Sequence, residues 1–249
     1  MKQTILFDLD DTLVHCNKYF NLVINQFANL MTDWFRDYGL TAQDVQGKQT
    51  EIDIAGVQVL GFKSEHFPQS FIETYRHFSN VLGRAASAVE EDTLWKLGLS
   101  VYELETEPYP FMEETLDRLA GDGHELHLYT GGEPLIQRRK IERFSLERYF
   151  GNRIYVRRHK NIEALENIVQ TGDFDRRRTW MIGNSIRTDI VPALTAGIHA
   201  IHMKADSEWL YNIVGIDVQP KGVFLSLGRL PDIPPAIEGH IRRTEEEVG

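Results

Sequence analysis

The sequence is poor in cysteine: Cys16 is the single cysteine among 249 residues, so no intramolecular disulfide can form. This usage is compatible with a reducing cytosol, where structural disulfides are rare. No stretch approaches the roughly 20 apolar residues that span a bilayer. The first residues, Met1-Lys2-Gln3, lead within a few positions into acidic residues and leave no room for the apolar region of a signal peptide. These absences predict a soluble, cytoplasmic protein.

Basic residues are also scarce, since 27 Lys and Arg face 37 Asp and Glu and give a net charge of −10. A broad nucleic-acid or membrane surface needs clustered Lys and Arg, so neither partner is expected, although a locally positive pocket remains compatible with the total. With 42% hydrophobic residues and no low-complexity tract, the chain can bury one large core or two unequal ones. The sequence leaves the oligomeric state open between monomer and homodimer.

Three acidic residues, by contrast, stand close together near the start of the chain. The apolar run Thr4-Ile5-Leu6-Phe7 is short and β-prone, which predicts a buried strand, and it leads directly into Asp8, Asp10 and Asp11. Like charges a few Å apart repel strongly at a buried strand end unless a cation or a proton compensates them. The pattern therefore favours a metal site over the alternative, an acidic turn or helix cap.

The segment from residue 15 to about 106 has the periodicity of helices. Apolar and aromatic residues recur at three- and four-residue spacing between Phe20 and Phe35 and again between Phe71 and Leu82, and Val89–Leu97 suggests a further helix. Such aromatic stripes are typical of core packing. Between these helices, Ile52–Phe62 contains two glycines and is predicted as a short extended excursion.

From Pro108 onward, strand-like segments alternate with helical ones, which predicts βαβ units and a mainly parallel sheet of the α/β class. Strands are expected at 125–129, 153–156, 179–182 and 199–203, with an edge strand at 223–227. Helices are expected at 112–121, 134–144, 160–169 and 189–196. The α/β core thus comprises residues 1–14 and 107–230, interrupted after its first strand by the helical segment 15–106. Residues 231–249 are expected to form a surface-packed or frayed tail.

Polar groups follow several of the predicted strands, and the carboxyl ends of parallel strands meet at one edge of a sheet. Thr130-Gly131-Gly132 offers a hydroxyl and backbone N–H groups to an anion, or forms a plain strand-to-helix turn. Asn184 and Asp189 have the spacing of cation ligands or of a helix cap. Lys160 opens a predicted helix, where the helix dipole disfavours a cation, so an anionic neighbour is expected.

These segments resemble, in order and spacing, the four motifs of the haloacid dehalogenase-like hydrolase superfamily. The segments are Phe7-Asp8-Leu9-Asp10-Asp11-Thr12-Leu13, Thr130-Gly131, Lys160 and Gly183-Asn184-Ser185-Ile186-Arg187-Thr188-Asp189. The resemblance covers about 150 residues and implies a Rossmann-like parallel sheet. It also implies that residues 15–106 are the helical cap that this family carries between its first and second motifs.

The resemblance further implies a phosphohydrolase that acts on a small phosphorylated metabolite. Asp8 would be the nucleophile that forms an aspartyl-phosphate, and Asp10 the acid and base. Asp10 would begin protonated because neighbouring carboxylates crowd it. Thr130 and the Gly131 N–H would bind phosphate oxygens, while Lys160 would balance charge on the nucleophile and the phosphoryl group.

The implied cofactor is Mg²⁺, held by the Asp8 carboxylate, the Asp10 backbone carbonyl, Asn184 and Asp189. The fourth motif of the family usually begins with Gly-Asp, and here the Asp is replaced by Asn184. An amide oxygen can ligate Mg²⁺ but carries no formal charge, so we expect weaker metal binding.

Other functions are compatible with the same core motifs. Asp10 argues against a dehalogenase, and no lysine of the helical segment is marked as the Schiff-base lysine of a phosphonatase. A phosphomutase and a catalytically attenuated binding or regulatory protein remain as alternatives, the latter supported by Asn184. Arg138, Arg139 and Lys140 lie within one helical turn and are expected to form a solvated face. Arg176-Arg177-Arg178 is expected to be a basic surface turn.

Overall fold

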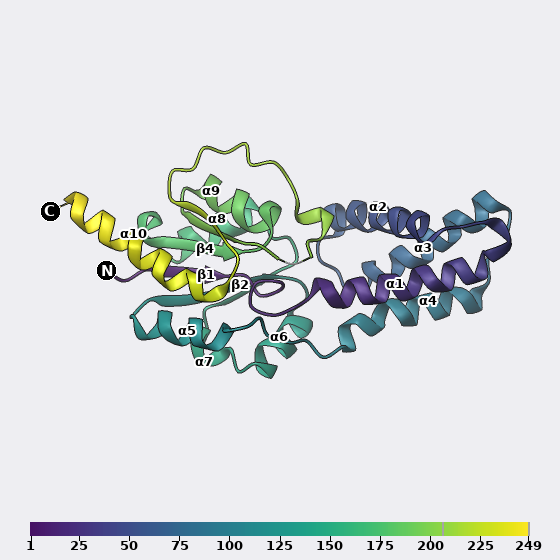
Figure 1. Cartoon of the computed structure of the whole chain (residues 1–249), viewed down its shortest axis with the longest axis horizontal. Coiled ribbons are helices and arrows are strands. Elements are labelled where there is room, and N and C mark those ends of the chain that lie inside the picture. Colours follow the sequence, from purple (N-terminus) through teal and green to yellow (C-terminus); the bar gives the residue numbers. More distant parts are fainter. Residues whose placement is uncertain (206, 249) are drawn as a thin grey trace. The chain divides into compact units, whose positions relative to one another are not determined.

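The computed structural model describes residues 1–205 and 207–248, and the chain divides into two compact units (Figure 1). The larger unit, here called the sheet unit, comprises Met1–His15 and the chain from Thr106 onward. The smaller, here called the helical unit, is Cys16–Glu105. None of the helices in the described ranges has the length and apolar character that crossing a bilayer requires.

In the described part of the chain, six parallel strands form one sheet in the order β3-β2-β1-β4-β5-β6. Their bounds are β1 Thr4–Phe7, β2 Glu125–Gly131, β3 Ile154–Arg157, β4 Thr179–Gly183, β5 His199–Met203 and β6 Phe224–Leu227. The predicted α/β class is confirmed, and β6 lies at an edge as expected. Because β1 is central, the carboxylates that follow it lie between the ends of β2 and β4.

Helices cover both faces of the sheet, and the side chains of β1 alternate between the two layers. Ile5 and Phe7 point into one core and Leu6 into the other. The first core is shared with α5 Met112–Gly121, α6 Pro134–Arg143, α7 Glu147–Phe150 and α10 Ile233–Val248. The second is shared with α8 Ile162–Thr171 and α9 Val191–Ala196. Short 3₁₀ turns lie at Arg36–Tyr38, Val101–Glu103, Arg176–Arg178, Leu210–Asn212 and Leu230–Asp232.

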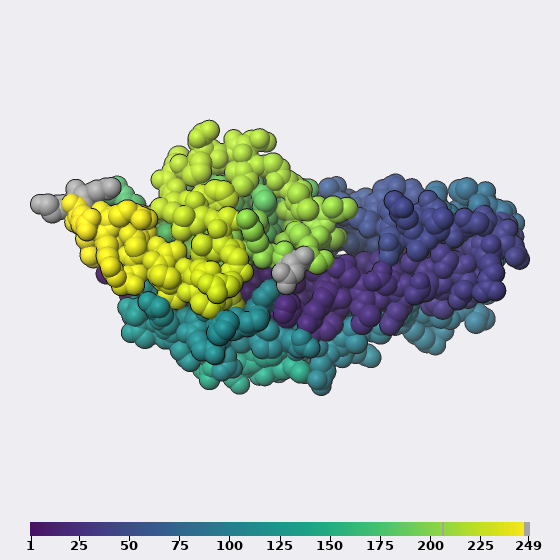
Figure 2. All heavy atoms as spheres, viewed as in Figure 1, coloured from purple at the N-terminus to yellow at the C-terminus, as the bar shows by residue number. Residues whose placement is uncertain are grey.

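The C-terminal segment forms a helix packed on the sheet unit, which agrees with the surface-packed alternative of the prediction and not with the frayed one. One side of α10 forms part of the molecular surface, where it is drawn in yellow in Figure 2. Its other side carries Ile233 and Ile237, which are fully buried in the first core. Burial of these isoleucines stabilises the packing of the helix on the sheet unit. The last residue of the predicted tail, Gly249, lies outside the described residues.

The helical unit contains four longer helices in its described residues: α1 Asn17–Trp34, α2 Ala42–Leu60, α3 His66–Leu82 and α4 Ala88–Ser100. The aromatic stripes pack against one another as expected. The rings of Phe27 and Phe71 stack with centroids 4.1 Å apart, and Tyr75 packs edge-on against Phe35. These contacts show that the aromatic residues of this unit form its core.

The prediction of an extended excursion at Ile52–Phe62 is wrong, because α2 continues through this segment to Leu60. The glycine at position 56 lies inside the helix rather than breaking it. A Cβ atom at Gly56 would lie 1.9 Å from a ring carbon of His66, which is itself buried. The missing side chain therefore serves close packing of α2 against α3, a cause that local sequence does not distinguish from a turn.

Candidate active site

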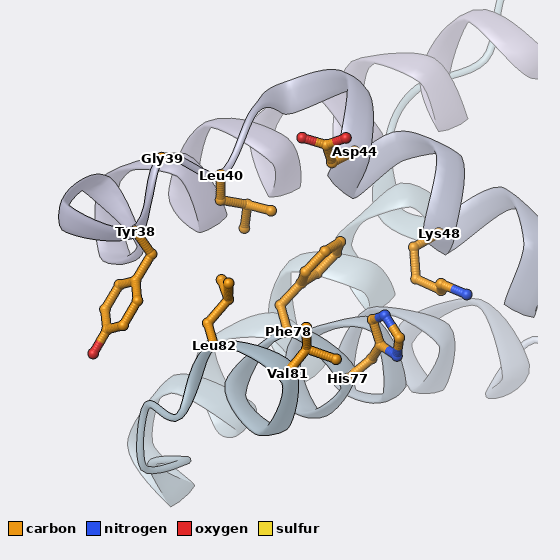
Figure 3. A pocket seen from close by; sticks show the side chains of 9 residues that line it. All are labelled: Tyr38, Gly39, Leu40, Asp44, Lys48, His77, Phe78, Val81 and Leu82. Carbon is orange, nitrogen blue, oxygen red and sulfur yellow. The ribbon is translucent and has the colours of Figure 1, made fainter.

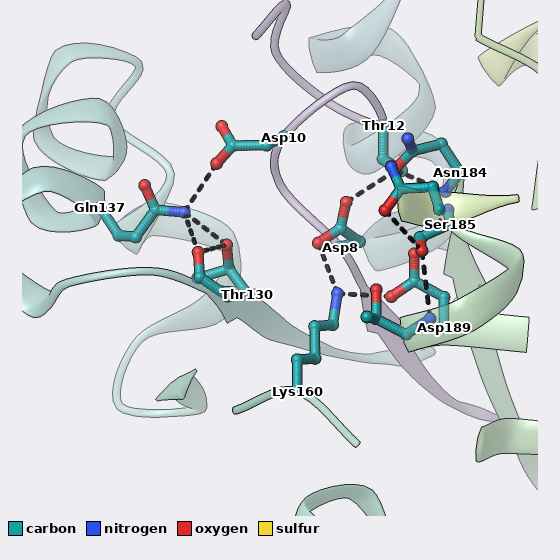
Figure 4. A network of polar contacts seen from close by, with 12 residues as sticks. Asp8, Asp10, Thr12, Thr130, Gln137, Lys160, Asn184, Ser185 and Asp189 are labelled. Carbon is teal, nitrogen blue, oxygen red and sulfur yellow. Dashed lines mark hydrogen bonds and ion pairs between the residues drawn. The ribbon is translucent and has the colours of Figure 1, made fainter. Parts of the chain in front are cut away.

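Three buried charged groups from different parts of the chain meet at the carboxyl end of the sheet. Asp8 follows β1, Lys160 follows β3, and Asp189 lies beyond β4 (Figure 4). The Lys160 Nζ atom lies 2.5 Å from Asp8 Oδ1 and 2.5 Å from Asp189 Oδ1. The sequence-predicted residues of three motifs are thus brought together around one ammonium group.

Burial and neighbouring charges perturb both sides of this ion pair. Burial raises the pKa of the Asp8 carboxyl to about 7, since Lys160 offsets only part of that effect and the Asp189 carboxylate adds to it. Burial on its own lowers the pKa of Lys160, but the carboxylates of Asp189 and Asp8 outweigh it and hold that pKa above its ordinary value. Two buried carboxylates share one ammonium, so the cluster has a deficit of positive charge.

Lys160 does not open a helix as predicted. Asn161 is the N-cap of α8, with its side chain accepting a hydrogen bond from the Ala164 N–H, and Lys160 precedes it. The lysine side chain is 2% exposed, and its Nζ lies 4.9 Å from the centroid of the Tyr129 ring. The carboxylates of Asp8 and Asp189, which pair with the ammonium, offset its unfavourable position near the positive end of the helix dipole.

Asp189 is held by the turn that contains it. The turn Ile186–Ile190 has π-helical geometry, and the Ser185 hydroxyl caps it by accepting from the Thr188 N–H. The Ser185 N–H donates to Asp189 Oδ2 at 3.0 Å. A Cβ atom at Gly183 would lie 2.2 Å from the same oxygen, so only glycine lets this carboxylate lie over the strand end. Both Asp189 oxygens are therefore engaged within the chain.

Thr12 links the first and fourth motifs. Asp11 takes a left-handed φ of 58°, which Asp tolerates better than most residues, and this turns the chain back toward Asp8. The Thr12 hydroxyl donates to Asp8 Oδ2 at 3.0 Å and accepts from the Asn184 N–H at 3.1 Å. Asn184 Oδ1 lies 3.4 Å from the same hydroxyl. A carboxylate oxygen of Asp8 and the amide oxygen of Asn184 thus both face the Thr12 hydroxyl.

A glutamate that the sequence did not single out completes this side of the site. Asn184 Nδ2 donates to both carboxylate oxygens of Glu208, at 3.0 and 3.1 Å. Glu208 also accepts from Asn212 Nδ2 and from the Trp209 N–H. Because both Glu208 oxygens can only accept, they fix the orientation of the Asn184 amide, with its nitrogen toward Glu208 and its oxygen toward Thr12. Glu208 lies in the loop after β5 with no motif around it, so only the fold identifies it.

Asp10 points away from Asp8 and contacts helix α6 (Figure 4). Its Oδ2 accepts from Gln137 Nε2 at 2.9 Å, and its Oδ1 lies 2.6 Å from Lys140 Nζ. The prediction that Lys140 belongs to a solvated face is wrong, because its side chain is only 14% exposed and faces this carboxylate.

Thr130 lies at the end of β2, beside the same helix. Its hydroxyl is fully buried and accepts from Gln137 Nε2 at 2.6 Å. The next residue, Gly131, is the last of the strand, and its carbonyl accepts from the same amide at 2.8 Å. The second motif is thereby joined to Asp10 through one side chain.

The donor set suits a hard cation. Asp8 Oδ2 and Asn184 Oδ1 are oxygen atoms that converge on the Thr12 hydroxyl, and the buried charges lack one positive unit. Within the described ranges, no three or more His, Cys, Asp or Glu side chains are clustered as a metal site. The candidate ligands are therefore mixed carboxylate, amide and backbone oxygens, as Mg²⁺ accepts.

A separate cavity of about 400 Å³ lies in the helical unit (Figure 3). It is lined mainly by apolar side chains, among them Leu40, Phe78 and Leu82. The charged groups on its wall already have partners: Asp44 closes the N-cap of α2, and Lys48 pairs with Glu51 at 2.6 Å. None of the sequence-predicted site residues lines this cavity.

Comparison with known proteins agrees with these motifs. The family described as haloacid dehalogenase-like hydrolase matches residues 2–197. A curated relative, glyceraldehyde 3-phosphate phosphatase of Methanothermobacter thermautotrophicus, is 25% identical over 214 residues, which are 83% of this chain and 87% of that protein.

Solved structures share the fold over nearly the whole chain. A haloacid dehalogenase-like family hydrolase from Xanthomonas campestris superposes with a TM-score of 0.76 at 21% identity, covering 98% of this chain and 94% of its own. The HAD-hydrolase YfnB from Bacillus subtilis, in a form bound to magnesium, has a TM-score of 0.66 at 17% identity and covers 95% and 99%. At these identities the likeness concerns the fold.

Proposed function

Because the chain belongs to the haloacid dehalogenase-like hydrolase family, we propose that it is a Mg²⁺-dependent phosphomonoesterase with an aspartyl-phosphate intermediate. The observation that carries the proposal is the buried ion pair of Lys160 with Asp8 at the end of β1. The substrate class, a small phosphorylated metabolite, is supported by the relative named glyceraldehyde 3-phosphate phosphatase.

In the first half-reaction, an Asp8 oxygen attacks phosphorus, and the bond between phosphorus and the ester oxygen breaks. The leaving oxygen takes a proton from Asp10 and departs as an alcohol. Lys160 balances the charge of the nucleophile, and the Thr130 hydroxyl and the Gly131 N–H would donate to phosphate oxygens. The products of this step are the free alcohol and phosphorylated Asp8.

In the second half-reaction, water attacks the phosphorus of the phosphorylated enzyme and gives its proton to Asp10. The acyl phosphate bond breaks, inorganic phosphate leaves, and the Asp8 carboxylate is restored. Asp8, the Asp10 carbonyl and Asn184 would hold Mg²⁺, which would offset the repulsion between a carboxylate and a phosphate dianion. Asp189 acts indirectly, through Lys160, because one of its oxygens pairs with the Lys160 ammonium and the other accepts from the Ser185 N–H.

A panel of phosphomonoesters assayed with Mg²⁺ tests the proposal. We expect phosphate release that a chelator abolishes and Mg²⁺ restores, and we expect Asp8→Asn to lose at least about 10³-fold in kcat. Asp122→Asn, which changes an exposed carboxylate in the same unit, is the matched control and should retain activity. Undiminished phosphate release by Asp8→Asn would remove Asp8 from the nucleophile's role.

A further inference from the structure

Two side chains of α6 contact the two oxygens of the Asp10 carboxylate. Gln137 and Lys140 are three residues apart, which places them on one face of the helix. Gln137 Nε2 donates to Oδ2 at 2.9 Å, and Lys140 Nζ donates to Oδ1 at 2.6 Å. Neither interaction could be read from the sequence, because the contact joins residues about 130 positions apart.

The local fold is shaped to hold Gln137 in this place. Its side chain is 1% exposed, and its two amide hydrogens are shared among Asp10, the Thr130 hydroxyl and the Gly131 carbonyl (Figure 4). Gly132 has a φ of 133°, and a Cβ atom there would lie 3.2 Å from the Gln137 side chain. The backbone after β2 therefore leaves room for this side chain beside Thr130.

Both Asp10 oxygens accept hydrogen bonds from donors. The two donors therefore fix the orientation of the Asp10 carboxylate at both of its oxygens. Asp10 is also 25% exposed at its side chain, so without these donors its carboxylate could rotate toward solvent.

We propose that Gln137 and Lys140 are positioning residues that hold the Asp10 carboxylate for hydrolysis of the phosphorylated enzyme. The inference rests on the proposed function, because Asp10 serves as base only if Asp8 is first phosphorylated. In that step the water O–H bond breaks, the proton goes to Asp10, and the water oxygen joins phosphorus as the acyl phosphate bond breaks. Gln137 and Lys140 exchange no proton, and they act on the reaction only through the Asp10 carboxylate that they hold.

The inference predicts which half-reaction fails when a donor is lost. Gln137→Glu keeps the shape of the side chain but replaces the amide donor with an acceptor, and Lys140→Met removes the cation and keeps much of the length. With 4-nitrophenyl phosphate, we expect kcat to fall at least tenfold in each variant, while the rate of the initial nitrophenolate burst changes less than threefold. The fraction of enzyme trapped as acid-stable, hydroxylamine-sensitive phosphoenzyme at steady state should rise accordingly.

Arg139→Met is the matched control, because it removes the same charge from the exposed side of the same helix and should leave both rates unchanged. Lys140→Arg should restore most of kcat, which a loss of folding would not allow. Equal loss in burst rate and kcat, or unchanged kcat, overturns the inference alone. Absence of any phosphoenzyme in the wild-type protein overturns the proposed function and this inference together.

Discussion

Asn184 shows how one side chain can fill a position that usually carries a charge. Its amide nitrogen is bound by Glu208, and this leaves the amide oxygen facing Thr12 and Asp8. The negative charge that the amide lacks is present on Glu208, one hydrogen bond further away. In the proposed metal site, the neutral residue would therefore offer an oxygen to the cation without adding a third carboxylate beside Asp8 and Asp189.

Replacing this amide by a carboxylate should separate metal binding from stability. Asn184→Asp places a charge against Glu208 and removes two hydrogen bonds, so we expect the metal-free protein to lose about 1–3 kcal/mol of unfolding free energy. The Mg²⁺ concentration that gives half-maximal activity should fall about tenfold, because a charged ligand attracts the cation more strongly. Urea unfolding without metal and activity against Mg²⁺ concentration measure the two effects.

The double variant Asn184→Asp with Glu208→Gln restores a donor opposite the new carboxylate and should recover most of the lost stability. Tighter Mg²⁺ binding by the wild-type protein than by Asn184→Asp would contradict the explanation of this position.

Helix α2 contains two glycines that have different reasons to be there. Gly56 faces the buried ring of His66, whereas a Cβ atom at Gly47 would meet nothing within 4 Å. Helix propensity treats the two positions alike, since alanine is favoured over glycine by about 1 kcal/mol at either. Only the contact between α2 and α3 distinguishes them.

This difference predicts opposite effects of the same substitution. Gly47→Ala should stabilise the protein by about 0.5–1 kcal/mol, because it lowers the entropy of the unfolded chain. Gly56→Ala should destabilise it by about 1–3 kcal/mol, because His66 is buried and its ring is bonded to the Asp53 carbonyl. Thermal melts of the two variants give the signs, and stabilisation by Gly56→Ala would show that α3 yields to the added methyl group.

The stability of the whole molecule depends on an acidic residue, Asp53, that is buried inside the helical unit. Burial raises the pKa of the Asp53 carboxyl to about 7, and the nearest basic group is His66, with Nε2 3.6 Å from Asp53 Oδ1. In the unfolded chain the same carboxyl titrates near 3.8. Folding therefore favours the protonated form over the interval between these values.

The protein should consequently lose stability as the pH rises. Below pH 3.8 the Asp53 carboxyl is protonated in both the folded and the unfolded protein. Between about pH 4 and 7 it is protonated only in the folded protein, so the unfolding free energy falls by up to about 4 kcal/mol over this interval. Above about pH 7 this contribution no longer changes. Asp53→Asn should remove this part of the decline. Urea unfolding at pH 5 and pH 8 measures it, with the exposed Asp92→Asn as control. Parallel declines in the wild-type protein and Asp53→Asn would contradict the assignment.

Local sequence identified most of the strands and helices because each reports its environment through hydrophobic periodicity. It also located the groups at the ends of β1, β2 and β4, because a parallel sheet brings successive strand ends to one edge. Ile52–Phe62 and Lys140 were misassigned for a common reason. A glycine or a lysine on a helix has the same local pattern whether it faces solvent or a distant partner.

The order of the motifs and the acidic strand end, which identify the fold and the Asp8 nucleophile candidate, are encoded along the chain within short segments. The contacts of Gln137 and Lys140 with Asp10, and of Glu208 with Asn184, exist only once the sheet is assembled. They join residues 24 to 130 positions apart, at distances set by the packing of a helix or a loop against the sheet. Hydrogen bonds act over about 3 Å, so no pattern along the chain can specify them.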